Sequence, residues 1–169
     1  AIARQLATRE HAMLTAFHTP PDAGEAMAAL LPGWDVQPQA EGDLGARMLA
    51  AATAAKGPVL VIGTDCPALS PMHLRSAARA LHEGADVTLI PAEDGGYVLI
   101  GLRKAEPTLF DRIPWGTPKV LAETRARIVA RRPDAHACAR TCARRPSHIA
   151  AMPSRVFAIE LPATASQSQ

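Results

Sequence analysis

The stretch Val59-Leu60-Val61-Ile62-Gly63-Thr64-Asp65-Cys66-Pro67 decides the fold. Its four consecutive apolar residues, three of them β-branched, predict a short strand that is buried on both faces. Gly63 then allows the chain to leave the strand conformation, and Pro67 prevents the strand from continuing. Asp65 is therefore expected at the carboxyl end of a central strand, where open α/β sheets bind their ligands.

The same pattern recurs about thirty residues later. Residues 86–90 predict a second strand, and residues 71–83 between the two strands predict a helix that Ser70 caps. This unit predicts a right-handed strand–helix–strand crossover in a parallel sheet. The second strand leads into Ala92-Glu93-Asp94-Gly95-Gly96-Tyr97, so a second strand end also delivers acidic groups, here beside paired glycines.

The remaining pattern indicates more strands and helices around this centre. Asp22 and Asp43 are expected to cap the two helices that follow them. Further strands are expected at residues 11–17, 34–36, 97–102 and 155–161. Further helices are expected at residues 23–31, 43–55 and 119–130.

The bulk properties are those of one globular domain. The chain has 169 residues, 48% of them hydrophobic and 20% charged, with a net charge of +2. The net charge gives no argument for a nucleic-acid or membrane partner, and no run of about 18 apolar residues predicts a membrane span. Three cysteines do not make a disulfide framework, so we expect a cytoplasmic protein. Residues 1–130 are expected to form the domain, and residues 131–169 a basic, partly disordered tail.

Four blocks of the chain, in this order, resemble the DUF2064 family, a "glycosyltransferase A" group found near radical-SAM proteins. The resemblance covers residues 34–125, and its blocks are Gly42-Asp43-Leu44-Gly45-Ala46-Arg47-Met48, Gly63-Thr64-Asp65-Cys66-Pro67, residues 91–102 and Trp115-Gly116-Thr117. It implies a three-layer α/β/α sandwich with a mainly parallel sheet, of the GT-A, nucleotide-diphospho-sugar transferase-like type. It also implies that Asp65 helps to hold Mg²⁺ or Mn²⁺ on a nucleotide diphosphate.

The chain departs from this family in two places. The family's first strand and its nucleotide-gripping Lys-x-Pro-x-x-Gly-x-x-Lys-Thr-Arg-Leu loop have no counterpart here, and residues 131–169 replace the family's usual ending. We therefore expect an N-terminally truncated domain. Because a missing strand leaves hydrogen-bonding groups of a sheet unpaired, we also expect homodimerisation or aggregation.

The two aspartates are the candidate catalytic and metal-binding residues. Carboxylates together with substrate phosphates are the ligands that Mg²⁺ prefers. We expect Asp65 to bind the cation, and Asp94 to help with the metal or the acceptor. The spacing alone is equally compatible with turn or cap roles, which are common for aspartate.

The candidate substrate-binding residues also have structural alternatives. Gly95 and Gly96 let backbone N–H groups approach a sugar or phosphate closely, or they make an ordinary hairpin turn. Tyr97 contacts the substrate or belongs to the core. Arg47 is a third candidate, and it faces either a phosphate or solvent. Trp115 and Thr117 lie on one loop. This loop either binds the acceptor or is anchored to the core by the tryptophan.

The sequence thus predicts a metal-dependent transferase that binds a nucleotide or nucleotide sugar and an unidentified acceptor. Glycosyl transfer from a nucleotide-diphosphate sugar is the first hypothesis. Nucleotidyl transfer to a phosphorylated small molecule, as in guanylyltransferases, is the alternative. A third hypothesis, a non-catalytic fragment or binding module, follows from the missing nucleotide loop.

Overall fold

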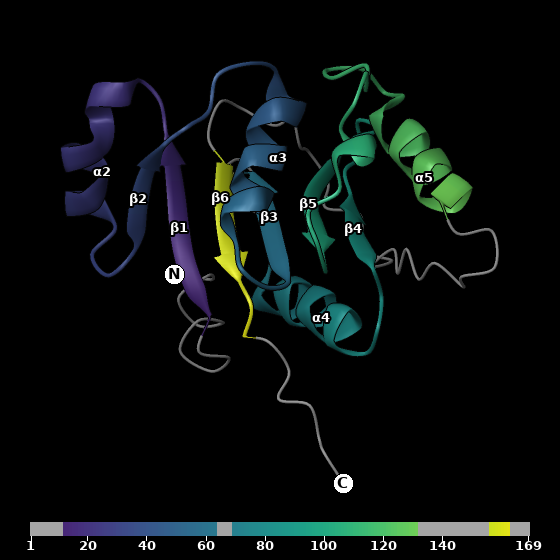
Figure 1. Cartoon of the computed structure of the whole chain (residues 1–169), viewed down its shortest axis with the longest axis horizontal. Coiled ribbons are helices and arrows are strands. Elements are labelled where there is room, and N and C mark those ends of the chain that lie inside the picture. Colours follow the sequence, from purple (N-terminus) through teal and green to yellow (C-terminus); the bar gives the residue numbers. More distant parts are fainter. Residues whose placement is uncertain (1–11, 64–68, 132–155, 163–169) are drawn as a thin grey trace, which may run out of the picture.

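The structure of the protein is a computed structural model that describes residues 12–63, 69–131 and 156–162. The described part forms one six-stranded sheet flanked by helices (Figure 1), which confirms the predicted α/β class. The strands are β1 (Met13–His18), β2 (Asp35–Pro38), β3 (Val59–Gly63), β4 (Val87–Pro91), β5 (Tyr97–Leu102) and β6 (Val156–Glu160). The helices are α2 (Gly24–Leu30), α3 (Leu44–Ala54), α4 (Pro71–His82) and α5 (Val120–Arg131), with 3₁₀ turns η1 (Pro21–Ala23) and η2 (Pro107–Leu109).

The sheet is mixed, so the prediction of a mainly parallel sheet is wrong. Its strands stand in the order β2-β1-β6-β3-β5-β4, and only the pairing of β1 with β2 is parallel. Strands β1 to β4 nevertheless run in one direction. The two opposed strands stand between them, β6 between β1 and β3 and β5 between β3 and β4. These insertions separate strands that would otherwise be parallel neighbours.

The expected strand–helix–strand unit is present as β3, α4 and β4, but β5 lies between its two strands. The reason is the tight turn after β4, in which the Ala92 N–H donates to the Gly96 carbonyl at 2.9 Å. A turn this short joins antiparallel strands, because parallel strands need a long crossover. Leu99 of β5 consequently faces Ile62 on one side and Ile90 on the other.

β6 is a central strand although it comes last in the chain. It pairs with both β1 and β3, and Ile159 stands opposite Leu14 and Leu60. The Ile159 side chain is completely buried. The strand expected at residues 155–161 is therefore confirmed, and it adds residues beyond position 130 to the domain.

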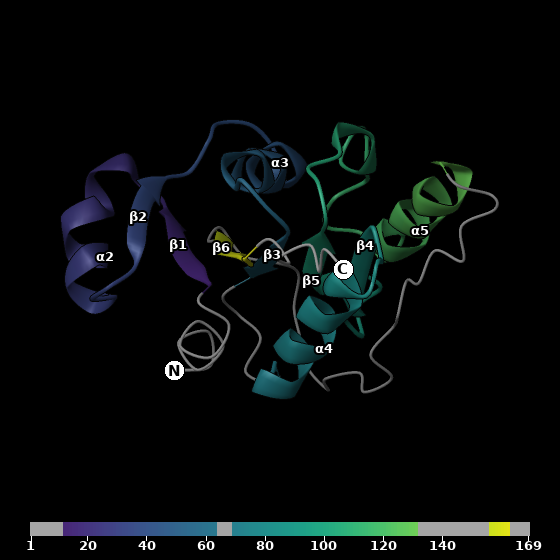
Figure 2. The same ribbon diagram turned by 60° about the horizontal axis from the view of Figure 1, so that its bottom comes forward.

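Helices cover both faces of the sheet (Figure 2). Leu60 and Ile62 of β3 belong to the core beneath α4, whereas Val59 and Val61 belong to the core beneath α3 and α5. This alternation follows from the two-residue period of a strand. It confirms that β3 is buried on both faces, as its unbroken apolar run predicts.

The predicted helix starts are correct for α3 and α4. The Asp43 carboxylate accepts the Ala46 N–H at 2.8 Å, and the Ser70 hydroxyl accepts the His73 N–H at 3.4 Å. The His73 ring in turn accepts the Ser70 N–H at 3.1 Å, which completes a capping box. Asp22 makes no cap, because η1 begins before α2 and takes this residue into its own turn.

Within the described ranges, every helix is too short or too polar to cross a membrane.

Candidate functional site

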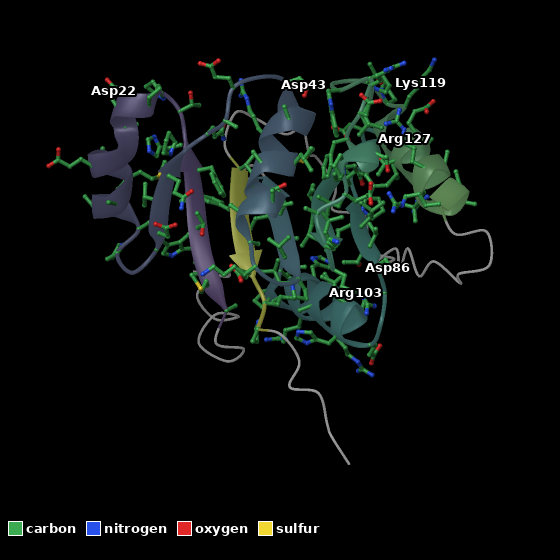
Figure 3. All side chains as sticks on the ribbon, in the orientation of Figure 1. Asp22, Asp43, Asp86, Arg103, Lys119 and Arg127 are labelled. Atoms are coloured by element: carbon green, nitrogen blue, oxygen red, sulfur yellow. The ribbon has the colours of Figure 1, made fainter. Side chains whose placement is uncertain are left out.

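The candidate site lies at one edge of the sheet, which we call the carboxyl edge. Because β1 to β4 share a direction, their last residues all reach this edge; they are His18, Pro38, Gly63 and Pro91. Figure 3 shows Asp43 before α3 and Lys119 before α5 at the same end of the molecule, whereas Asp86 and Arg103 lie at the other end. The carboxyl edge is where open α/β sheets bind ligands.

Asp94 lies at the carboxyl edge, in the turn between β4 and β5. Its Oδ1 accepts the Gly96 N–H at 2.9 Å, which makes an Asx turn. The side chain is half-buried. The hydrogen bond fixes the direction of the carboxylate, so Asp94 serves the turn and presents a negative charge at the same time.

Contacts within the protein explain why the residue directly after Asp94 is a glycine. Gly95 has φ +85°, and a Cβ on it would lie 2.2 Å from the Pro118 carbonyl oxygen. The Gly95 carbonyl also accepts the Leu121 N–H at 2.9 Å, so the turn is docked on the start of α5. The Gly96 N–H is engaged by Asp94. The predicted hairpin turn is therefore present, and the N–H of Gly96 already has a partner.

Arg47 lies in the first turns of α3 and is half-buried. Its Nε donates to the Gly42 carbonyl at 3.0 Å, and its NH1 group contacts the Gln39 side-chain oxygen at 3.5 Å. These contacts hold the guanidinium over the loop that enters α3 at the carboxyl edge. Arg47 thus places a positive charge beside the Asp43 carboxylate, which already caps this helix N-terminus and would itself repel an anion.

Trp115 connects two parts of the carboxyl edge. Its indole packs so closely on α3 that a Cβ on Gly45 would lie 2.7 Å from Trp115 Nε1. Its ring also meets Tyr97 edge-to-face, with 6.4 Å between the centroids. Trp115 thus spans from the first turn of α3 to the first residue of β5. Sequence reasoning singled out Trp115 but missed Gly45, whose need for a bare Cα arises only in three dimensions.

Thr117 shapes the entry to α5. Its hydroxyl donates to the Pro114 carbonyl at 2.7 Å and accepts the Lys119 N–H at 3.3 Å. Both contacts are local, so Thr117 fixes the loop in which Trp115 lies.

Tyr97 is buried, with 4% of its surface exposed. Burial raises the pKa of the Tyr97 hydroxyl well above its ordinary value, and the nearby Thr124 hydroxyl offsets only part of this rise. The two hydroxyls do not meet in regular hydrogen-bonding geometry. Tyr97 consequently supports Trp115 from the core side of the site.

Asp65 lies outside the described residues. Within the described ranges no three His, Cys, Asp or Glu side chains gather into a metal site. Asp94 alone does not make a cage for a cation. A half-buried carboxylate does fit Mg²⁺ or Mn²⁺, because such ions are commonly held by one or two carboxylates together with substrate phosphates.

His18 is a residue of the carboxyl edge that sequence reasoning missed. It is the last residue of β1 and is 3% exposed, and its Nδ1 lies 3.0 Å from the Pro20 carbonyl oxygen. Its backbone carbonyl accepts the Gln39 N–H at 2.9 Å. The sequence signal that could have indicated His18 is its place at the end of an apolar strand, directly before Thr-Pro-Pro.

The comparisons with known proteins give one matching family model and a similar solved structure. The family described as "Uncharacterized protein conserved in bacteria (DUF2064)" matches residues 2–117. A solved structure from Desulfovibrio desulfuricans G20, described as a "putative nucleotide-diphospho-sugar transferase", is 33% identical to the chain with a TM-score of 0.66. The similarity covers 77% of this chain and 59% of that protein, so the chain spans less than two thirds of its relative. No curated protein matches the chain.

Proposed function

Because the chain belongs to the DUF2064 family, we propose that it is a metal-dependent transferase with a nucleotide-activated donor. The donor is a nucleotide-diphosphate sugar, and the transferred group is the sugar. The likeness to the Desulfovibrio protein supports this choice of donor. The observation that carries the proposal is the carboxyl edge, where four strand ends, the first turn of α3 and the Asp94 turn meet.

In this proposal the acidic residues hold the cation and Arg47 binds phosphate. Asp94 and Asp65 supply carboxylate oxygens as ligands of the cation, and phosphate oxygens of the donor supply further ligands. The bound Mg²⁺ or Mn²⁺ neutralises the charge that develops on the leaving nucleoside diphosphate. Asp94 is already oriented by the Gly96 N–H, so its carboxylate needs no rearrangement on binding. Arg47 reaches a phosphate oxygen from α3.

Trp115 borders the acceptor side of the site in this proposal. It is half-buried, and it packs against Gly45 of α3 and Tyr97 of β5. Aromatic faces pack well on the C–H faces of sugar rings and on flat apolar groups. The acceptor is therefore expected to be a small molecule that offers such a surface beside its reacting hydroxyl.

Donor binding is the first test. Thermal unfolding is followed with Mg²⁺ or Mn²⁺ and a panel of nucleoside diphosphates and nucleotide sugars. We expect one base to raise the melting temperature only when the metal is present. A ligand at 100 times its Kd stabilises the folded state by about 2.7 kcal/mol, which is easily seen as such a rise.

Matched variants assign the effect to the site. Asp94→Asn keeps the size of the side chain and removes its charge, so it should abolish the metal-dependent part of the rise. Asp22→Asn, an exposed aspartate on η1, should leave it unchanged. The absence of a rise with any ligand would favour a non-catalytic module instead.

The products decide which bond breaks. Released nucleoside diphosphate indicates glycosyl transfer. Released pyrophosphate from a nucleoside triphosphate and a phosphorylated acceptor indicates nucleotidyl transfer, and would replace the glycosyltransferase proposal.

A further inference from the structure

The position of Trp115 depends on a turn that precedes it. The backbone N–H of Trp115 donates to the Ile113 carbonyl at 2.8 Å, so its loop starts directly from the turn at residues 106–112. Ile113 is 5% exposed and anchors the end of this turn in the core. The indole therefore follows this turn closely in the chain, and it packs directly on the bare Cα of Gly45.

Arg127 of α5 holds this turn through three backbone carbonyls. Its NH1 group donates to the carbonyls of Thr108, at 3.1 Å, and of Asp111. Its NH2 group donates to the carbonyl of Arg112 at 3.4 Å. Figure 3 shows Arg127 on α5, on the side of the molecule that carries Lys119.

The Arg112 contact matters because the backbone of Arg112 is strained. Its φ is +48°, the only positive φ at a non-glycine residue of the described ranges. A residue with a Cβ pays about 1–2 kcal/mol for this conformation. A neighbouring group must therefore stabilise the turn in this form, and the guanidinium of Arg127 binds the carbonyl of the strained residue itself.

We propose that Arg127 is a positioning residue for the candidate site. It clamps the 106–112 turn to α5 and thereby keeps Trp115 seated between Gly45 and Tyr97. The planar fork of an arginine reaches three carbonyls at once, whereas a lysine ammonium on the same helix cannot. The inference rests on the proposed function only where it concerns the acceptor; the seating of Trp115 is independent of any activity.

Trp115 fluorescence tests the seating directly. Trp34→Phe leaves Trp115 as the only tryptophan, since the chain has two. In that background we expect Arg127→Lys to raise acrylamide quenching of Trp115 by about twofold, because the lysine loses the multiple contacts of the fork. Gly45→Ala is the positive control, since its Cβ must displace the indole.

Two further arginines provide matched controls. Arg131, one turn further along α5, donates to the Thr108 hydroxyl and forms an ion pair with Glu106, which a lysine can also form. Arg131→Lys should therefore leave the quenching unchanged. Arg75→Lys, at an exposed position of α4, should do the same. Equal quenching in Arg127→Lys and the parent, with Gly45→Ala quenched more strongly, would overturn the proposal.

The acceptor measurement connects the seating to the reaction. With the acceptor that the product assays identify, Arg127→Lys should raise KM for the acceptor about tenfold and leave kcat and the metal-dependent donor shift nearly unchanged, as expected when uniform binding is lost. An equal fall of kcat and donor binding would overturn the positioning role. If no acceptor is found, the transferase proposal fails while the quenching result still decides the role of Arg127.

Discussion

At the scale of single residues, the burial of Tyr97 leads to a prediction about the stability of the protein at high pH. It is the only tyrosine of the chain, so tyrosinate absorbance in the ultraviolet reports this residue alone. Because burial raises the pKa of its hydroxyl, the folded protein retains a proton that the unfolded chain loses near pH 10. Stability should therefore fall as the pH rises above about 10, and the absorbance should increase only when the protein unfolds.

The control for this titration is Tyr97→Phe, which should remove that part of the pH dependence. A tyrosinate band that appears near pH 10 while circular dichroism still shows the native fold would contradict the burial of the hydroxyl.

Gly95 and Gly33 form a matched pair at the same scale. Their φ angles are +85° and +84°, but a Cβ on Gly95 would lie 2.2 Å from the Pro118 carbonyl oxygen, whereas nothing lies within 4 Å of one on Gly33. Gly33→Ala should cost about 1–2 kcal/mol for the backbone conformation alone. Gly95→Ala should cost a further 1–3 kcal/mol or so, because the turn must move away from α5.

Urea unfolding of the two variants measures this difference. Equal losses would mean that the Asp94 turn is not docked on α5. Since Asp94 is positioned by this turn, Gly95→Ala should also weaken the metal-dependent donor shift, whereas Gly33→Ala should not.

At the scale of elements, the two predicted aspartate caps behave differently. The Asp43 carboxylate accepts the Ala46 N–H, so Asp43→Ala should destabilise the protein by about 1 kcal/mol. Asp22→Ala should change the stability by less than about 0.5 kcal/mol, because Asp22 makes no cap. Thermal unfolding of both variants provides the comparison, and similar losses would contradict the difference between the two helix starts.

The elements that the sequence predicted well are those with strong local signals. β3 is a run of apolar residues between breakers, and α4 starts with Ser70-Pro71, so both were found nearly to the residue. η2 was missed, since Glu106-Pro107 opens only a single turn. The contacts that seat Trp115 could not be predicted, because Gly45 and Arg127 carry no local sign of their partners.

At the scale of the whole molecule, strand order is what local pattern cannot provide. Each strand of an α/β sheet is recognisable by itself, but its neighbours are chosen by long-range packing. The strand–helix–strand pattern and the resemblance both led to the expectation of a parallel sheet, and the positions of β5 and β6 show that it is wrong. β5 is antiparallel to β4 because the short hairpin turn at Asp94 joins the two strands. β6 lies far along the chain from β1 and β3, the strands with which it pairs. The carboxyl edge, which carries the candidate site, is nevertheless present because β1 to β4 run in a common direction.

The central position of β6 in the sheet leads to the last prediction, which concerns the stability of the folded protein. Ile159 of β6 and Ile100 of β5 are both completely buried in the sheet, whereas Val129 on α5 is 60% exposed. Ile159→Ala and Ile100→Ala should each cost about 2–5 kcal/mol, as for other large apolar side chains removed from a core. Val129→Ala should change the stability by less than about 0.5 kcal/mol.

The measurement is the urea midpoint of the three variants at constant slope. If Ile159→Ala resembled Val129→Ala, β6 would not stand between β1 and β3, and the carboxyl edge would be split into two halves with nothing between them. If it resembles Ile100→Ala, β6 joins β1 to β3. The Arg47 and Asp94 sides of the candidate site then belong to one rigid sheet, as joint binding of a single donor requires.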